Sequence, residues 1–198
     1  DAGQEVLLDV LDGKVRVHVH CYRHDDIEGI YRVMDEFGVQ VASIQHALEA
    51  YKVRDLIIAH GTGVATWPDW WGFKMEAYDG IQENIALVDR PEGSCSVVHS
   101  DFDEGIQRLN QEAAKAMSRG NKAGMDIAPE RAIKWITSNA AKSLGIDDQT
   151  GSLTTGLMAD VVIWSGNPFS VYAKANQVFI DGCLLYTSQS PRDLAQSR

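Results

Sequence analysis

Short apolar runs alternate with helix-like patterns along the first three quarters of the chain. Apolar or valine-rich runs typical of strands occupy residues 14–20, 39–44, 63–67 and 95–98. Between and after them, apolar residues recur every three or four positions, which is typical of a helix that packs on a sheet. Such helices are predicted over residues 25–37, 48–60, 80–89, 104–117 and 129–144. Strands that alternate with helices predict parallel β/α units.

The pattern changes after Gly145. Turn residues and short apolar runs follow, as in GSLTTGLMADVVIW and VFIDG, without a helical period. These features predict a β-rich module that begins at about Ile146. We therefore expect one α/β domain over residues 1–145 and a β-rich module over residues 146–182.

Potential metal ligands stand where three of the predicted strands end. The first strand ends at His20, the second at His46, and the fourth runs through His99 into Asp101. In a parallel β/α barrel the carboxyl ends of all strands face one rim, so side chains distant in sequence can meet there. Two imidazoles and a carboxylate suit zinc or a similar divalent ion. The sequence thus predicts a divalent metal, best matched by zinc, bound by His20, His46 and Asp101.

A metal at this rim would give the residues around it a chemical task. A bound divalent ion lowers the pKa of its water from about 15.7 to about 7, which makes hydroxide available at neutral pH. A carboxylate beside that water can pass its proton to a leaving group, so Asp101 and His46 are predicted to be catalytic. The alternative is that each strand-end histidine is structural. Three suitable residues at three strand ends favour the metal site.

Further rim positions are predicted to touch the substrate. Tyr22 and Arg23 follow the first strand, and Trp70 and Trp71 lie in the loop at residues 67–80. That loop carries three tryptophans and a phenylalanine within seven positions, and rim loops determine specificity in barrels. A covering cluster that seals the core is the alternative for the loop. Of the remaining histidines, we expect a packing role for His18, a place beside the metal ligands for His99, and surface positions for His24 and His60.

Composition narrows the class of protein further. The 198 residues carry a net charge of −10, which argues against a nucleic-acid partner. Hydrophobic residues make up 44%, yet no apolar run is long enough to span a membrane. The three cysteines are odd in number and far apart, so a disulfide framework is not expected. These features predict a soluble protein and do not fix its compartment.

Several stretches resemble the amidohydrolase superfamily, specifically its imidazolonepropionase-related branch. They are HCYRHDDI, IQHALEAYKV, the DWW loop, HSDFDEGIQRLNQEAAKAM, WITSNAAKSLGIDDQTGSL, ADVVIWSGNPFSVY and VFIDG. The resemblance covers residues 5–182 and implies a metal-dependent (β/α)8 barrel of the TIM type with a small β-sandwich. It implies that His20, His46 and Asp101 close the fifth, sixth and eighth strands. In that family the two histidines are metal ligands, the second only assisting in one-metal members, and the aspartate binds metal and acts as acid and base.

Both ends of the chain depart from the family pattern. The HxH pair of the first strand and the bridging Lys or Glu of the fourth have no counterpart here. We therefore expect a fragment that carries strands five to eight and is inactive alone. Its two open sheet edges favour pairing with a second copy. Residues 183–198 begin with CLLYTS, which resembles translated sequencing adapter, so we expect read-through. The alternative is a genuine terminal strand in a hairpin after Asp181 and Gly182.

Together these features predict a hydrolase that cleaves C–N bonds of a small-molecule amide or cyclic amide by attack of metal-bound hydroxide. Two alternatives remain open on the sequence. One is a non-catalytic barrel fragment or binding module, and the other is a metal-free barrel enzyme that uses histidine and aspartate as base and acid. Metal analysis distinguishes them.

Overall fold

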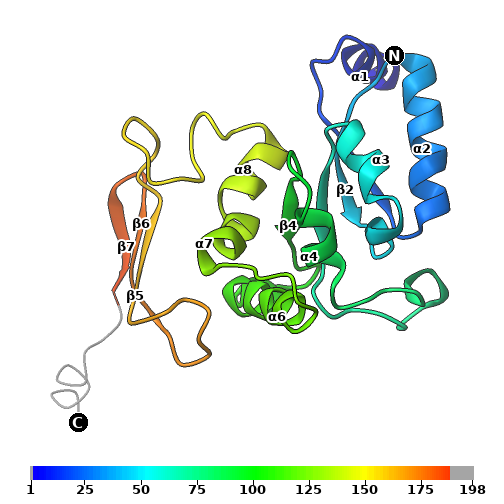
Figure 1. Ribbon diagram of the computed structural model, residues 1–198. Helices are drawn as coiled ribbons and strands as arrows, with labels where there is room; N and C mark the ends of the chain where they lie inside the picture. The colour runs from blue at the N-terminus through cyan, green and yellow to red at the C-terminus, as the bar shows by residue number, and fades with distance from the viewer. Residues whose placement is uncertain (1, 188–198) are drawn as a thin grey trace, which may run out of the picture.

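Two separate sheets form the framework of the computed structural model, which describes residues 2–187 (Figure 1). The first sheet is parallel and has the order β1 (Val17–Cys21), β2 (Val41–His46), β3 (Gly63–Thr66) and β4 (Ser96–Val98). The second is antiparallel and consists of β5 (Val161–Trp164), β6 (Ala175–Ile180) and β7 (Cys183–Thr187). The predicted α/β class, with a parallel sheet followed by a β-rich module, is confirmed.

The helices follow the strands in the predicted order but are more broken. The elements are α1 (Ala2–Leu11), α2 (His24–Phe37), η1 (Ala50–Lys52), α3 (Arg54–Ala59), η2 (Met75–Ala77), α4 (Asn84–Asp89), α5 (Asp103–Ile106), α6 (Leu109–Lys122), α7 (Pro129–Ala132), η3 (Ile133–Ile136) and α8 (Ser138–Leu144). The single helix expected over residues 129–144 is interrupted at Thr137, whose hydroxyl donates to the carbonyl of Ile133 at 2.8 Å. A threonine hydroxyl bonded in this way competes with the regular helical ladder.

The helices bury one face of the parallel sheet, and this decides which side chains reach the other face. Ile27 and Tyr31 of α2 pack with Ile44 of β2 in one cluster, where Val19 and Cys21 of β1 also lie. A second cluster gathers α4, α6 and η3 against β4 around the fully buried Trp135. Val19 and Cys21 pack towards α2. Because side chains alternate along a strand, His18 and His20 lie on the opposite face of the sheet.

The antiparallel sheet is joined to the helices through the turn before β6. The side-chain amide of Asn110 in α6 donates to the carbonyl of Pro168 at 2.6 Å, and Phe169 packs against the second core cluster. All five residues of β7 are exposed. β7 pairs antiparallel with β6, so it forms the strand that the alternative interpretation expected after Asp181 and Gly182. The expected boundary at residue 182 falls inside this β6–β7 hairpin. Whether residues 183–198 are adapter read-through stays a prediction, and residues 188–198 lie outside the described part of the chain.

Two histidines that were expected at the surface are partly buried instead. His60 stacks on Tyr31 with ring centroids 4.0 Å apart, and its nitrogens lie near the carbonyl of Leu56 and the carboxylate of Asp35. The expectation was wrong because both His24 and His60 stand at helix ends, where local hydrophobic periodicity carries no information about tertiary contacts. Across residues 2–187, no helix has the length and apolar character needed to cross a membrane.

Gly120 in α6 provides a test of this packing. An added Cβ would lie 2.7 Å from the Cβ of Ala86 and closer still to the Cδ1 of Ile127. Gly120→Ala should therefore destabilise the fold by about 1–3 kcal/mol, although alanine normally favours a helix. Gly29→Ala in α2 is the matched control, because its Cβ meets only the guanidinium of Arg32 at 3.8 Å. That change should stabilise by up to about 1 kcal/mol in thermal melting. Equal effects at the two sites would contradict the packing of α6.

His60 makes stability depend on pH. Its bonds to the carbonyl of Leu56 and the carboxylate of Asp35 raise the pKa of the imidazole above its ordinary value. Such a group stabilises the fold below its unfolded pKa, and the stabilisation is lost as pH rises through the folded pKa. His60→Asn should therefore cost more stability at about pH 5 than at about pH 9, as measured by urea denaturation. A loss independent of pH would assign the role of His60 to its stacking on Tyr31 alone.

Candidate functional site

The parallel pairing of β1 with β2 brings two histidines together. Cys21 is in register with His46, and His20 with Gln45. The Nδ1 atom of His20 lies 2.9 Å from the Nε2 atom of His46, because the positive φ of His46 turns its imidazole out of the regular alternation of the strand. Two imidazole nitrogens this close share either a proton or a cation, because two facing lone pairs repel each other. His20 is exposed at the free edge of the sheet, whereas His46 is only 5% exposed.

Aromatic rings pack closely around His46. The rings of Tyr22 and Trp67 lie 4.8 Å and 4.7 Å from the imidazole, centroid to centroid, and 6.0 Å from each other. His99 lies against the same Trp67 ring at 4.8 Å and tilts towards His46 at 5.3 Å. Trp70 extends the stack, with its ring 5.5 Å from that of Trp67. The imidazole of His46 thus packs among aromatic rings and is only 5% exposed.

Burial keeps these imidazoles neutral near neutral pH. Desolvation lowers the pKa of His46, although the charge of Asp101 opposes this. Desolvation also lowers the pKa of His99 to about 4, and His46 adds to the effect. The Nδ1 atom of His46 and the Nε2 atom of His99 are buried and have no hydrogen-bond partner within the described part of the chain. A neutral imidazole with a free nitrogen can ligate a metal or accept a proton.

Asp101 lies in the loop after β4 and is exposed. Its charge acts on both His46 and His99, so it faces the same region, and it also acts on Lys74. Within residues 2–187, no group of three histidine, cysteine, aspartate or glutamate side chains is close enough to hold a metal ion. The structure thus brings His20 and His46 together, and it does not gather Asp101 with them into a cluster of three ligands. Metal binding by these residues stays a prediction.

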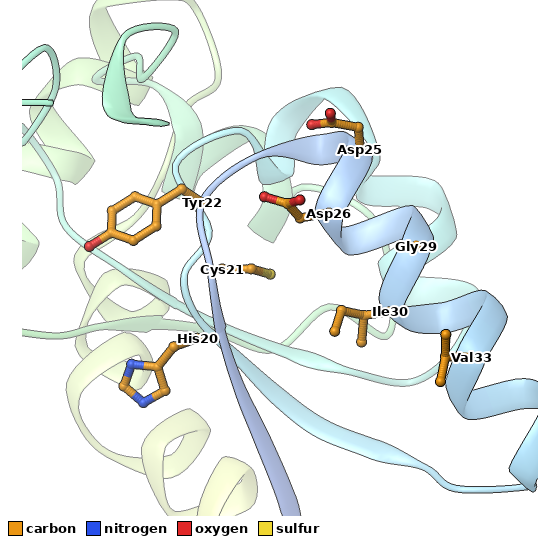
Figure 2. A pocket seen from close by; sticks show the side chains of 8 residues that line it. All are labelled: His20, Cys21, Tyr22, Asp25, Asp26, Gly29, Ile30 and Val33. Carbon is orange, nitrogen blue, oxygen red and sulfur yellow. The ribbon is translucent and has the colours of Figure 1, made fainter. Parts of the chain in front are cut away.

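The predicted substrate-contacting residues divide into two groups. Tyr22 and Trp70 belong to the ring stack around His46, as described above. Arg23 turns away, because its guanidinium pairs with the carboxylate of Asp25 at 2.9 Å, at the start of α2. Trp71 is 48% exposed. A groove of about 530 Å³ lies between β1 and α2. In Figure 2 the side chains of Tyr22 and His20 point away from α2, whereas Cys21 points towards it.

Other residues of the site were not identified from the sequence. Trp67 directly follows β3, so its place at a strand end was a usable signal. Lys74 carried no such signal, yet its ammonium lies 3.9 Å from the centre of the Tyr22 ring. The hydrogen bond to Tyr22 raises the pKa of Lys74. A cation over the ring that covers His46 adds positive charge next to Asp101.

Two curated proteins illustrate the similarity of this chain to known sequences. An amidohydrolase of Hapsidospora irregularis, tasK, is 29% identical over 187 residues, which cover 92% of this chain and 18% of that protein. The imidazolonepropionase of Shewanella baltica (strain OS185) is 53% identical over 38 residues, or 19% of this chain and 9% of that protein. The resemblance found in the sequence motifs is therefore confirmed.

A solved structure and a family profile extend the similarity to nearly the whole chain. An amidohydrolase from Thermotoga maritima MSB8 superposes with a TM-score of 0.83 and 31% identity, covering 95% of this chain and 48% of that one. This chain thus spans about half the length of that structure. The profile of the amidohydrolase family matches residues 3–185. The chain belongs to the amidohydrolase family.

Proposed function

We propose that this chain forms the carboxyl-terminal half, strands five to eight, of a (β/α)8 barrel, together with part of a small β-sandwich. The barrel would belong to a metal-dependent enzyme that hydrolyses the C–N bond of an amide or cyclic amide. The convergence of His20 and His46 carries this proposal. Four parallel strands with helices packed against them, and a family profile over residues 3–185, support it.

The ligand types support a divalent ion such as zinc. His20 and His46 would hold it through the two nitrogens that lie 2.9 Å apart, and Asp101 would be the third group. When bound, such an ion supplies Lewis-acid activation of water and of the substrate carbonyl. The ring stack around His46 serves the same purpose, because it keeps the imidazole neutral and fixes its orientation.

The residues of the chain would then divide the proton transfer and the binding of the substrate. Asp101 accepts a proton from the attacking water at its carboxylate and delivers it to the leaving nitrogen. Its exposure at the rim lets it reach both positions. Tyr22, Trp67 and Trp70 offer flat apolar surfaces beside the reacting bond, and they exclude water from the open edge of His46.

The metal content of the chain tests the ligand set. A zinc site takes three or four protein ligands. Within residues 2–187 no third ligand stands close enough to join the two imidazole nitrogens, so the chain alone should hold zinc weakly. After dialysis against zinc-free buffer, elemental analysis of the purified chain should find well below one zinc per molecule. Near-stoichiometric zinc would mean that the chain holds a complete ligand set and that we have misassigned it.

Asp101 is tested in a full-length enzyme that contains this chain. Asp101→Asn keeps the shape of the side chain but cannot take up a proton, so turnover of an amide substrate should fall by a factor of about 10²–10⁴. Asp103→Asn is the matched control, because Asp103 lies two residues further on, is exposed, and accepts a hydrogen bond of 3.1 Å from the Glu104 amide. Comparable losses in both variants would exclude Asp101 as the proton carrier.

A further inference from the structure

The chain is strained where β2 ends at His46. His46 has φ of 71° and Ala47 has φ of 39°, although neither is glycine. Left-handed backbone costs a non-glycine residue about 1 kcal/mol or more, and two in succession need support from the surrounding structure. Ala47 is completely buried, so solvent does not relieve this strain. The strained turn points the imidazole of His46 towards His20.

The polar groups of this turn are held by two other segments. The amide of Ala47 donates to the carbonyl of Cys21 at 2.9 Å, and the amide of Glu49 donates to the carbonyl of Tyr22 at 3.1 Å, so the end of β1 fixes one side. The carbonyl of Ala47 accepts a local hydrogen bond of 3.0 Å from the amide of Ala50. It also accepts one of 2.9 Å from the side-chain amide of Asn84, which lies 37 positions later at the start of α4.

Asn84 is suited to this contact because both ends of its amide are used. Its Oδ1 atom accepts from the backbone amide of Tyr51 at 3.0 Å, and its side chain is only 1% exposed. A buried amide bonded at both ends has a fixed orientation, since a flip would set donor against donor and acceptor against acceptor. Asn84 therefore joins the turn at Ala47 to η1.

We propose that Asn84 is a positioning residue, which holds the strained turn after β2 so that His46 faces His20. Asn84 does not touch the predicted metal position and acts through the backbone of Ala47. The consequence for catalysis rests on the proposed function, whereas the effect on the geometry of the turn does not.

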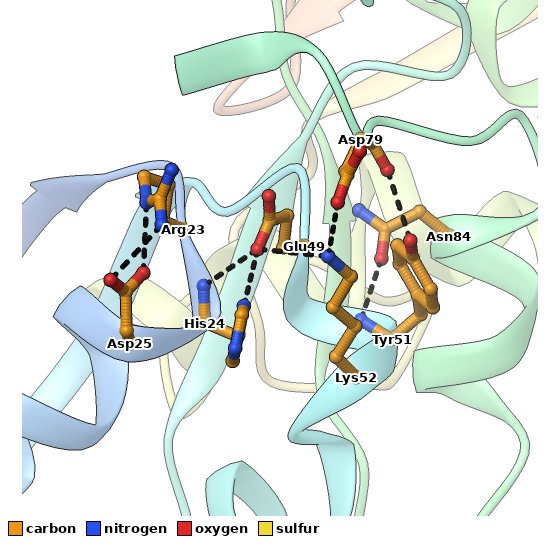
Figure 3. A network of polar contacts seen from close by, with 8 residues as sticks. All are labelled: Arg23, His24, Asp25, Glu49, Tyr51, Lys52, Asp79 and Asn84. Carbon is orange, nitrogen blue, oxygen red and sulfur yellow. Dashed lines mark hydrogen bonds and ion pairs between the residues drawn. The ribbon is translucent and has the colours of Figure 1, made fainter. Parts of the chain in front are cut away.

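A second network strengthens the same region from the solvent side (Figure 3). The buried carboxylate of Glu49 lies 2.5 Å from Nδ1 of His24 and 3.3 Å from the ammonium of Lys52. Lys52 also pairs with Asp79 at 2.7 Å, and the Asp79 carbonyl accepts from the hydroxyl of Tyr51. The loops after β1, β2 and β3 are thus linked on both sides of the turn, and Asn84 supplies the side-chain hydrogen bond to the Ala47 carbonyl, beside the local bond from the Ala50 amide.

Asn84→Asp tests the proposal, and Asn110→Asp is the matched control. Both asparagines are buried and donate to a backbone carbonyl, Asn84 to Ala47 and Asn110 to Pro168. In Asn84→Asp the amide hydrogen of Ala47 should exchange about ten- to a hundredfold faster by NMR, as expected for a lost buried donor. In Asn110→Asp the exchange rate of the Ala47 amide hydrogen should be unchanged once the difference in global stability is accounted for.

The ring protons of His46 give a second readout that a general loss of stability would not move. They should resonate upfield, because the rings of Tyr22 and Trp67 stack against the imidazole at 4.8 Å and 4.7 Å. Asn84→Asp should reduce this ring-current shift, while that of His60, which stacks on Tyr31, should persist as an internal reference. Unchanged His46 shifts in Asn84→Asp, or equal changes in Asn110→Asp, would overturn the proposal.

Relief of the strain at Ala47 keeps the test decisive if Asn84→Asp folds poorly. Glycine tolerates left-handed φ, so Ala47→Gly removes much of the strain that Asn84 offsets. The fall in melting temperature caused by Asn84→Asp, or by the milder Asn84→Ser, should shrink to about half or less in the Ala47→Gly background. The same fall in both backgrounds would show that Asn84 does not support the turn. None of these readouts depends on hydrolase activity, so they remain informative if the proposed function fails.

Discussion

The register between β1 and β2 is the constraint on which the rest of the site depends. Pairing Cys21 with His46 brings the two strand ends side by side, and the positive φ of His46 then turns its imidazole to within 2.9 Å of that of His20. A slip of one residue would turn every β1 side chain to the opposite face and send His20 into the core beneath α2. The packing of Val19 and Cys21 against α2 prevents that slip, so the hydrophobic core fixes the position of a polar site.

Burial gives His46 its chemical character. An imidazole that stacks against Tyr22 and Trp67 and is only 5% exposed loses hydration in its charged form, so it stays neutral and able to ligate or to accept a proton. The same enclosure carries a cost, because the free nitrogens of His46 and His99 have no hydrogen-bond partner in the described region.

Strain and support are balanced at the end of β2. The left-handed turn at His46 and Ala47 is unfavourable by itself, and it persists because bonds from Cys21 and Asn84 hold it from two sides. Three loops after three successive strands contribute to this arrangement. Such convergence is the physical reason that rim sites of parallel sheets can hold precise geometry although they are built on loops.

The sequence by itself determined the order of strands and helices, the strand ends at His46 and near His20, and the family. Each of these follows from neighbouring residues, through the periodicity of apolar positions or through a short motif. Only the tertiary structure decided the roles of Lys74, Glu49 and Asn84. Each acts through a partner on another loop, and no local pattern encodes such a contact. The same limit explains the unexpected burial of His60. Patterns along the chain fix which face a residue occupies, whereas packing of distant segments fixes what it meets there.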